Sequence, residues 1–320
     1  MALLSLENVG VAIGQAKPLE GLNLAVERGE ILGIVGESGS GKSMTALAIM
    51  GLLPLIGGKV SAGAIRFDGV DLTALSEAEY RHLRGKRMAL VTQNPMTSLD
   101  PIRTVGSQID QVGMLHLGQS ADVARRRSIE IMEQLRIPDA ATVHGQYPHQ
   151  LSGGMKQRIV IAIALMGEPD LIVADEPTTA LDVTIQAQII QILVDLVRVR
   201  GLALILITHD MGVVAQACDR VAVLYAGRMA ESAPVGEIFA SPRHPYTRAL
   251  IACIAKEGQA PGTLVGIPGT IPGVFAYPSG CRYHPRCALA VPDCARKVPP
   301  EQDLGLTRVA CDRLEETAHV

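Results

Sequence analysis

The chain has 320 residues, of which 48% are hydrophobic and 19% are charged, and its net charge is −3. This composition is typical of a globular protein with one large domain and an appendage, or two modest domains. The near-neutral charge, the 3% of aromatic residues and the lack of tryptophan argue against a nucleic-acid partner.

No apolar run approaches the roughly 20 residues that a membrane-spanning helix needs. The first eight residues, Met-Ala-Leu-Leu-Ser-Leu-Glu-Asn, lack the basic start and the long apolar stretch of a secretory signal. We therefore expect a cytoplasmic protein that meets a membrane only through a partner.

Hydrophobic patterning predicts two kinds of strand. Residues 3–13 and 62–72 alternate apolar and polar side chains, which is typical of a half-exposed antiparallel layer. Other short runs are apolar throughout and favour strands buried on both faces of a mostly parallel sheet. These runs are residues 30–36, 87–93, 170–176 and 202–210.

The most specific motif is the run Gly-Glu-Ser-Gly-Ser-Gly-Lys-Ser at residues 36–43, which fits G-x-x-x-x-G-K-[ST]. It lies between a predicted strand and a helix-forming stretch at 44–50, a setting that a flexible surface loop would not share. The glycines let successive N–H groups point at one anion at a helix N-terminus. Lys42 adds a positive charge for the phosphates, and the Ser43 hydroxyl is placed to hold Mg²⁺. The motif predicts binding of a nucleoside triphosphate.

The pattern between residues 94 and 166 is helical, with the clearest helix at 123–136, and indicates a helical insertion. Ser152, Gly153 and Gly154 open an apolar-periodic helix that reaches Gly167. Such a helix start can bind an anion, although an ordinary N-cap is the better explanation when it is considered alone.

Asp175 and Glu176 end the strand predicted at 170–176. One carboxylate at a strand end can hold Mg²⁺ through water, and a second can orient or deprotonate an attacking water. The interpretation of this pair as catalytic is strengthened because the pair follows the phosphate loop in the same chain. Further along, residues 220–233 predict a hairpin with its turn at Ala226-Gly227.

The composition changes near the C-terminus. After a helix predicted near 244–255, ten of the 25 residues at 256–280 are glycine or proline, so regular elements are not expected there. We predict a nucleotide-binding domain at 1–240, with a helical subdomain at about 94–166, and a C-terminal extension at 241–320. We also expect the extension to lie outside the core that holds the nucleotide site.

Six cysteines fall into two groups. Cys218 and Cys253 stand alone in apolar stretches and are expected to be small core residues. The others have the spacing C-x5-C-x6-C-x16-C, without the close pair that structural zinc usually uses. In a reducing compartment such a group favours a metal site, and a cuboidal cluster suits it better than zinc; free thiols or disulfides stay open. The four are Cys281, Cys287, Cys294 and Cys311.

Taken in order, these motifs resemble those of the ATP-binding subunits of ABC transporters. The resemblance implies an α/β P-loop NTPase cassette, with a RecA-like parallel sheet, an antiparallel β layer and a helical insertion. It implies that Glu176 is the catalytic glutamate, His209 the switch histidine and Asp182 the D-loop aspartate. Ser43, Gln93 and Asp175 would hold Mg²⁺, and Ser152, Gly153 and Gly154 would form the signature that acts on a partner's ATP. The implied ATP-binding residues are Gly36, Glu37, Ser38, Gly39, Ser40, Gly41, Lys42, Ser43, Met44, Gln93 and Asp175.

A narrower resemblance is to the dipeptide/oligopeptide/nickel importers, and within them to the dipeptide-type first ATPase. It rests on Met155 after the signature glycines, on the runs at 176–188 and 242–247, and on Cys-Arg-Tyr-His-Pro-Arg-Cys at 281–287. It implies a 4Fe–4S cluster on the four cysteines. It also implies a second, different ATPase subunit, two membrane-spanning permeases, an indirectly acting substrate-binding protein, and a place on the cytoplasmic face of the inner membrane.

The resemblance leaves some points open. The family usually has an aromatic residue before the phosphate loop to stack on adenine, but Val11, Ala12 and Ile13 occupy that region, so adenine would rest on aliphatic carbons. The cargo could be peptides, nickel chelates or opine-like solutes. A soluble ABC ATPase without a transport role is a further alternative, although the chain has no second cassette and no basic patch. Another is an electron-transfer tail switched by the ATPase.

Overall fold

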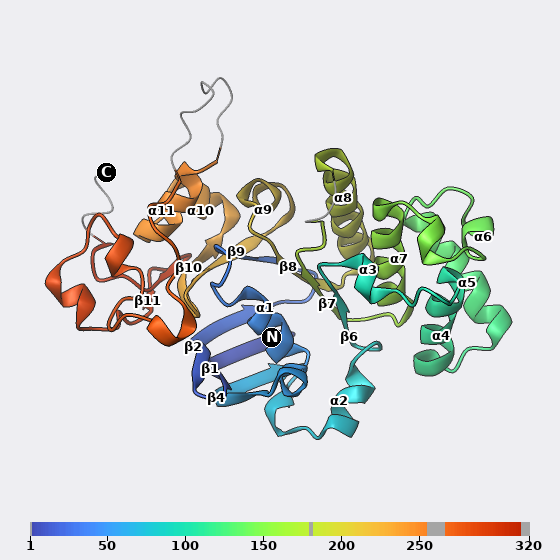
Figure 1. The fold of residues 1–320 in the computed structure, drawn as a ribbon, viewed down its shortest axis with the longest axis horizontal. Helices are drawn as coiled ribbons and strands as arrows, with labels where there is room; N and C mark the ends of the chain where they lie inside the picture. Colours follow the sequence, from blue (N-terminus) through green and yellow to red (C-terminus); the bar gives the residue numbers. More distant parts are fainter. Residues whose placement is uncertain (1, 179–181, 255–265, 315–320) are drawn as a thin grey trace. The chain divides into compact units, whose positions relative to one another are not determined.

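The computed structural model describes residues 2–178, 182–254 and 266–314 (Figure 1). The chain divides into two compact units. The first comprises Met1–Val26, Ile31–Thr73 and Ile207–Val320, and the second comprises Glu27–Glu30 and Ala74–Leu206. Both combine strands with helices, and their parallel strand pairs confirm the α/β prediction.

An antiparallel sheet forms one layer of the first unit, as the alternating segments predict. Its strand order is β2 (Ala16–Val26), β1 (Leu4–Ile13), β4 (Gly58–Phe67) and β5 (Val70–Asp71). The segment expected as one strand at 62–72 is broken because Asp68 and Gly69 both have positive φ, 49° and 81°, and turn the chain back. The sequence analysis did not identify β2.

A second group of strands in the first unit leads into the nucleotide loop. The strand β3 (Ile31–Val35) is buried along its whole length and pairs in parallel with β9 (Arg220–Tyr225). The predicted hairpin is confirmed: β9 pairs with β10 (Arg228–Pro234) through a turn at Ala226-Gly227. Beyond β10 the sheet continues with β12 (Arg308–Val309) and β11 (Gln302–Asp303), so the C-terminal extension completes its edge.

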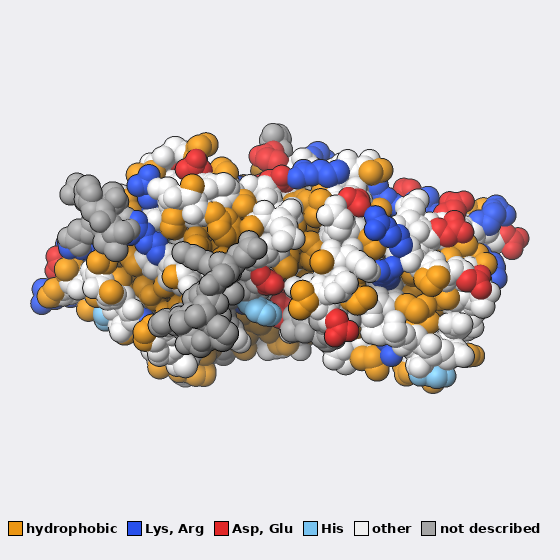
Figure 2. Space-filling view, turned by 90° about the horizontal axis from the view of Figure 1, so that it is seen from above, with side chains coloured by type: hydrophobic (Ala, Val, Ile, Leu, Met, Phe, Trp, Pro, Cys, Tyr) orange, Lys and Arg blue, Asp and Glu red, His pale blue; other side chains and the backbone are white. Residues whose placement is uncertain are grey.

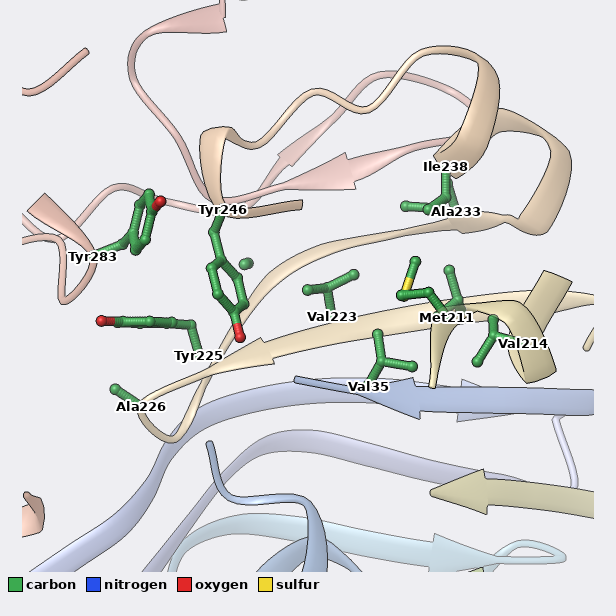
Figure 3. Close-up of a cluster of buried hydrophobic side chains, with 12 residues drawn as sticks. Val35, Met211, Val214, Val223, Tyr225, Ala226, Ala233, Ile238, Tyr246 and Tyr283 are labelled. Atoms are coloured by element: carbon green, nitrogen blue, oxygen red, sulfur yellow. The ribbon is translucent and has the colours of Figure 1, made fainter. Parts of the chain in front are cut away.

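A hydrophobic cluster joins this sheet to the C-terminal extension (Figure 3). The ring of Tyr225 on β9 lies 4.7 Å from the ring of Tyr246 and 5.1 Å from that of Tyr283, centroid to centroid. Val35, the last residue of β3, belongs to the same cluster. The expectation that the extension lies outside the core of the nucleotide site is therefore wrong. The reason is that three of the chain's six tyrosines meet here, and they bind the extension to the strands.

The helices of the first unit are short. They are α1 (Lys42–Ile49), α9 (Met211–Ala217), α10 (Val235–Ala240) and α11 (Pro245–Ala252), with 3-10 turns at Leu53–Ile56, Val274–Ala276, His284–Arg286 and Pro292–Ala295. The helix predicted near 244–255 corresponds to α11, and its predicted last residue lies outside the described ones. Of the Gly/Pro-rich stretch 256–280, residues 266–280 are described, and they contain one 3-10 turn and no strand or longer helix.

The second unit holds the remaining predicted strands and the helical insertion. The strands β6 (Met88–Val91) and β7 (Leu171–Asp175) pair in parallel, and β8 (Ala203–Ile207) neighbours β7. The insertion is confirmed as helical, and α4 (Val105–Leu117), α5 (Ala121–Gln134) and α7 (Gly153–Met166) pack on one another. The helix predicted at 123–136 runs from Ala121 to Gln134, because Ser120 caps its start and Arg136 has φ of 57°. The helices are α2 (Glu77–Leu83), α3 (Pro95–Ser98), α4 (Val105–Leu117), α5 (Ala121–Gln134), α6 (Ala140–Val143), α7 (Gly153–Met166) and α8 (Val183–Arg200), with a 3-10 turn at Pro148–Gln150.

No helix in the described part of the chain is both long enough and apolar enough to cross a membrane.

Candidate functional site

The predicted phosphate loop connects β3 to α1 within the first unit, as the motif requires. Gly36 has φ of 151° and Gly41 has φ of 106°. A Cβ atom at Gly36 would lie 2.3 Å from the Leu224 carbonyl oxygen, and one at Gly41 would lie 2.6 Å from Cδ2 of Leu19. Only glycine fits at these two positions, and the tight turn brings the loop to the N-terminus of α1, where an anion is favoured.

Lys42, the first residue of α1, folds its side chain back over this loop. Its side chain is buried, and Nζ donates to the carbonyl oxygens of Gly36 at 2.8 Å and Glu37 at 3.1 Å. The hydroxyl of the buried Ser40 has no hydrogen-bond partner among the described residues. A buried ammonium at the start of a helix, within a tight glycine-rich turn, suits a phosphate group.

In the second unit, the structure brings together two residues that lie 83 positions apart. Asp175 ends β7, Glu176 follows it, and Gln93 Nε2 donates to Glu176 Oε2 at 3.0 Å. Glu176 has φ of 46°, a left-handed conformation that is uncommon for a residue with a side chain. Such a conformation costs on the order of 1–3 kcal/mol and is found most often at functional sites.

The candidate signature also lies in the second unit. Ser152 is the N-cap of α7, and its Oγ accepts a hydrogen bond from the Met155 N–H at 3.3 Å. A Cβ atom at Gly154 would lie 2.8 Å from Cγ2 of Ile185, so this glycine allows the start of α7 to approach α8. Asp182 is the N-cap of α8, without a side-chain capping hydrogen bond. The structure thus shows Ser152 and Asp182 at the starts of two neighbouring helices.

His209 belongs to the first unit. It is exposed and lies between β8 and α9. The next residue, Asp210, caps α9 by accepting hydrogen bonds from the N–H groups of Gly212 at 2.7 Å and Val213 at 3.3 Å. This cap fixes the backbone next to His209.

The C-terminal extension contacts the phosphate loop, which the sequence analysis did not anticipate. Arg286 forms an ion pair with Glu37, and the Tyr246 hydroxyl accepts a hydrogen bond from the Glu37 N–H at 2.9 Å. Both residues fall inside the two motifs at 242–247 and 281–287 that carry the narrower resemblance. Nothing in the sequence spacing of Tyr246 and Arg286 predicts that these residues contact Glu37.

The four clustered cysteines line one cavity of the first unit, together with His244, Tyr283 and other residues of the extension. All four are free thiols. Burial raises the pKa values of the Cys281 and Cys287 thiols, and it raises that of Cys311 to about 11. Among the described residues, no group of three or more His, Cys, Asp or Glu side chains is arranged to hold a metal ion. The structure therefore shows a shared cavity, and it does not show a metal site.

Cys218 is a core residue, as predicted: its sulfur would lie 3.0 Å from a Cβ atom at Gly33, and burial raises the pKa of the thiol to about 12.

Comparison with known proteins agrees with these features. Residues 19–179 match the ABC transporter family, and residues 230–294 match the C-terminal region of oligopeptide/dipeptide transporters. The chain is 45% identical over 303 residues to the dipeptide transport ATP-binding protein DppD of Escherichia coli, covering 93% of this chain and 92% of that protein. It is 47% identical over 290 residues to a peptide import ATP-binding protein, named as putative, of Brucella melitensis, covering 87% and 86%.

Solved structures agree on the fold. A dimeric ATP-binding cassette in a post-hydrolysis state, bound to ADP and Pi, is 28% identical with a TM-score of 0.65, covering 72% of this chain and 98% of that one. A cassette from Clostridium perfringens, part of an ABC transporter complex, is also 28% identical with a TM-score of 0.65, covering 75% and 91%.

The fold and the phosphate loop define a P-loop ATPase. The chain belongs to the ABC transporter family as an ATP-binding cassette, in the branch that carries the oligopeptide/dipeptide transporter C-terminal region. The predicted fold class and the ATPase activity are thereby confirmed.

Proposed function

We propose that this chain is the ATPase subunit that powers the import of dipeptides or oligopeptides. The main support is its 45% identity, over 93% of its length, to a dipeptide transport ATP-binding protein. The match to the oligopeptide/dipeptide C-terminal region includes β10 and Tyr246, which lie in the core of the first unit, so this region is integral to the fold. ATPase assays of the reconstituted transporter with dipeptides, nickel chelates and opines test the cargo: dipeptides should stimulate hydrolysis, and stimulation by nickel chelates alone would contradict the proposal.

The proposed division of labour at the site follows the motifs. Residues 36–44 bind the triphosphate, and Ser43, Gln93 and Asp175 hold Mg²⁺, which neutralises the phosphate charge. Glu176 acts on the attacking water and His209 on the γ-phosphate. The hydrogen bond between Gln93 and Glu176 supports this assignment, because the proposed Mg²⁺ ligand and the proposed catalytic carboxylate lie within hydrogen-bond distance of each other. A preference for ATP over GTP is inferred from the family alone, because the aliphatic residues Val11, Ala12 and Ile13 occupy the region where an aromatic ring would stack on the base.

We propose that the chain works as a peripheral subunit at the cytoplasmic face of the membrane, paired with a second ATPase and bound to two permeases. A substrate-binding protein delivers the cargo to those permeases. Ser152, Gly153, Gly154 and the D-loop residue Asp182 would act on the partner's nucleotide. On the face in Figure 2, the coloured Lys and Arg side chains are interspersed with Asp and Glu side chains.

If Ser152 acts on a partner's ATP, the purified chain should hydrolyse ATP slowly, and the complete transporter should hydrolyse it much faster. Phosphate release from the chain alone and from the assembled complex measures this difference. Full activity of the isolated monomer, independent of its concentration, would contradict the proposal.

Ser152→Ala has a matched control in Ser120→Ala. Both serines cap a helix by accepting a hydrogen bond from the N–H three residues on, so each change should cost about 1 kcal/mol of stability. Ser152→Ala should also lower hydrolysis by the complex about 10-fold or more, because it removes a donor to the transferred phosphate. Equal activity of the two variants would show that Ser152 is only a cap.

We also propose that Cys281, Cys287, Cys294 and Cys311 bind a 4Fe–4S cluster. The cavity that all four line supports this proposal, as does the effect of Cys281, Cys287 and Cys294, which each raise the pKa of the Cys311 thiol. Four thiolates are the ligand set of such a cluster. The cluster would link the turn at 281–287 to β12 through Cys311, and it would stabilise an extension with few regular elements.

Protein purified without oxygen should therefore contain about four irons and four sulfides per chain. Single Cys→Ser variants of the four should lose the absorbance of the cluster near 400 nm, whereas Cys253→Ser should keep it, since Cys253 is not among the residues lining the cavity. Stoichiometric zinc, or no metal under strict anaerobiosis, would contradict the proposal and leave the ATPase assignment unchanged. Lack of the chromophore would also exclude an electron-transfer tail.

A further inference from the structure

We infer that Arg286 of the C-terminal extension is a positioning residue for the phosphate loop and acts through Glu37. The inference rests on the proposed role of residues 36–43 in binding ATP. It gives the extension a part in nucleotide binding, in addition to any role of its cysteines.

Two parallel hydrogen bonds join the Arg286 guanidinium to the Glu37 carboxylate. Arg286 Nη1 donates to Glu37 Oε2 at 2.8 Å, and Nη2 donates to Oε1 at 3.0 Å. The Arg286 side chain is 6% exposed and that of Glu37 is 30% exposed, so water screens the pair only weakly. Two parallel hydrogen bonds fix the direction of the carboxylate as well as its distance.

The Arg286 side chain is also held in place by contacts with groups other than Glu37. Its Nε donates to the Pro268 carbonyl oxygen at 2.7 Å, and Nη2 also donates to the Ile267 carbonyl oxygen at 3.3 Å. The guanidinium lies over the Tyr225 ring, 5.8 Å from its centroid. The hydrogen bonds that Arg286 donates to the Glu37 carboxylate raise the pKa of Arg286 above its ordinary value, so the guanidinium stays charged at any physiological pH.

The backbone of Glu37 is in turn hydrogen-bonded to Lys42, the residue that we propose contacts the phosphates. The Glu37 N–H donates to the hydroxyl of the fully buried Tyr246 at 2.9 Å, while the Glu37 carbonyl oxygen accepts from Lys42 Nζ at 3.1 Å. The Ser40 N–H donates to the same carbonyl at 3.2 Å. A shift of the Glu37 peptide would therefore move the acceptor that holds the Lys42 ammonium.

The extension has other anchors, so Arg286 is not needed to attach it. The strand β12 pairs with β10, and Tyr283 lies in the shared hydrophobic cluster. Arg282 forms an ion pair with Glu20 and stacks on Tyr277, 4.1 Å from the ring centroid. Loss of the Arg286 side chain should therefore affect the phosphate loop more than the attachment of the extension.

The test is a double-mutant cycle on the full-length chain with Arg286→Ala, Glu37→Gln and the combination of both. A fluorescent ATP analogue with Mg²⁺ gives the dissociation constant. Each single change should weaken binding about 10-fold, and the double change should weaken it by the same factor, because both remove one interaction. Arg286→Lys keeps the positive charge but cannot form the two parallel hydrogen bonds to Glu37. It should therefore bind the analogue more tightly than Arg286→Ala and less tightly than the wild type.

Arg296→Ala is the matched control, since Arg296 lies in the same extension, has a side chain 75% exposed and pairs with Asp293 at 3.8 Å. It should bind the analogue as the wild type does. If Arg286→Ala does not fold, Glu37→Gln alone decides the question, because it leaves the extension unchanged. Binding within 2-fold of wild type for either variant, or losses that multiply in the double variant, would overturn the inference. Unchanged binding by Lys42→Ala would instead overturn the proposed nucleotide site, and the inference with it.

Discussion

Replacing Glu176 by glutamine in the assembled transporter is expected to lower ATP hydrolysis by about 100-fold or more, because a positioned proton acceptor is lost. ATP binding should persist, since glutamine has nearly the same shape and the phosphate loop is unchanged. The amide can still accept the hydrogen bond from Gln93 Nε2, which is 3.0 Å long in the structure. The variant should therefore accumulate the ATP-bound, closed pair of ATPases.

Phosphate release and retention of radiolabelled ATP measure the two halves of this prediction. Glu130→Gln is the matched control: it removes one carboxylate from an exposed position on α5 in the same unit, and it should leave turnover unchanged. Wild-type turnover in the Glu176→Gln complex would exclude Glu176 as the catalytic carboxylate. Loss of both binding and turnover would show that Glu176 instead supports the nucleotide site.

The features that the sequence predicts well depend on short-range rules. The phosphate loop needs glycine where a Cβ atom would strike Leu224 or Leu19. The glycines of the sequence motif therefore predict the backbone conformation of the loop directly. The buried strands β3 and β8 are apolar throughout and β7 is apolar up to its last residue, Asp175, while the β9–β10 turn has positive φ at both Ala226 and Gly227. In each case a few neighbouring residues determine the conformation.

The features that the sequence analysis missed depend on contacts between distant residues. Arg286 lies 249 positions from Glu37, and Tyr246 lies 209 positions from it. Neither contact leaves a periodicity in the sequence, because each joins one isolated residue of the extension to Glu37. The strand β2 was missed for a local reason: Pro18 and Gly21 interrupt its alternation, while its pairing with β1 restores the strand.

Lys42→Ala is expected to weaken ATP binding by about 100-fold or more and to abolish hydrolysis. The Lys42 ammonium is already buried in the loop, so its charge acts on the phosphates with little screening by water. Its removal also leaves the Gly36 and Glu37 carbonyl oxygens without the donors at 2.8 and 3.1 Å. A 100-fold loss corresponds to about 2.8 kcal/mol, which one or two charge-assisted hydrogen bonds from the ammonium to the phosphates, at about 1.5–3 kcal/mol each, would account for.

The dissociation constant of the fluorescent ATP analogue measures this loss, and thermal unfolding shows whether the first unit stays folded. Lys86→Ala, which removes an exposed lysine of the second unit, should bind the analogue as the wild type does. The comparison with Glu176→Gln is decisive, because one variant should fail to bind ATP and the other should bind it without cleaving it. If Lys42→Ala bound ATP normally, the loop at 36–43 would not be the phosphate site. Equal defects in both variants would mean that Lys42 and Glu176 serve a single step, since binding and cleavage then depend on the same interaction.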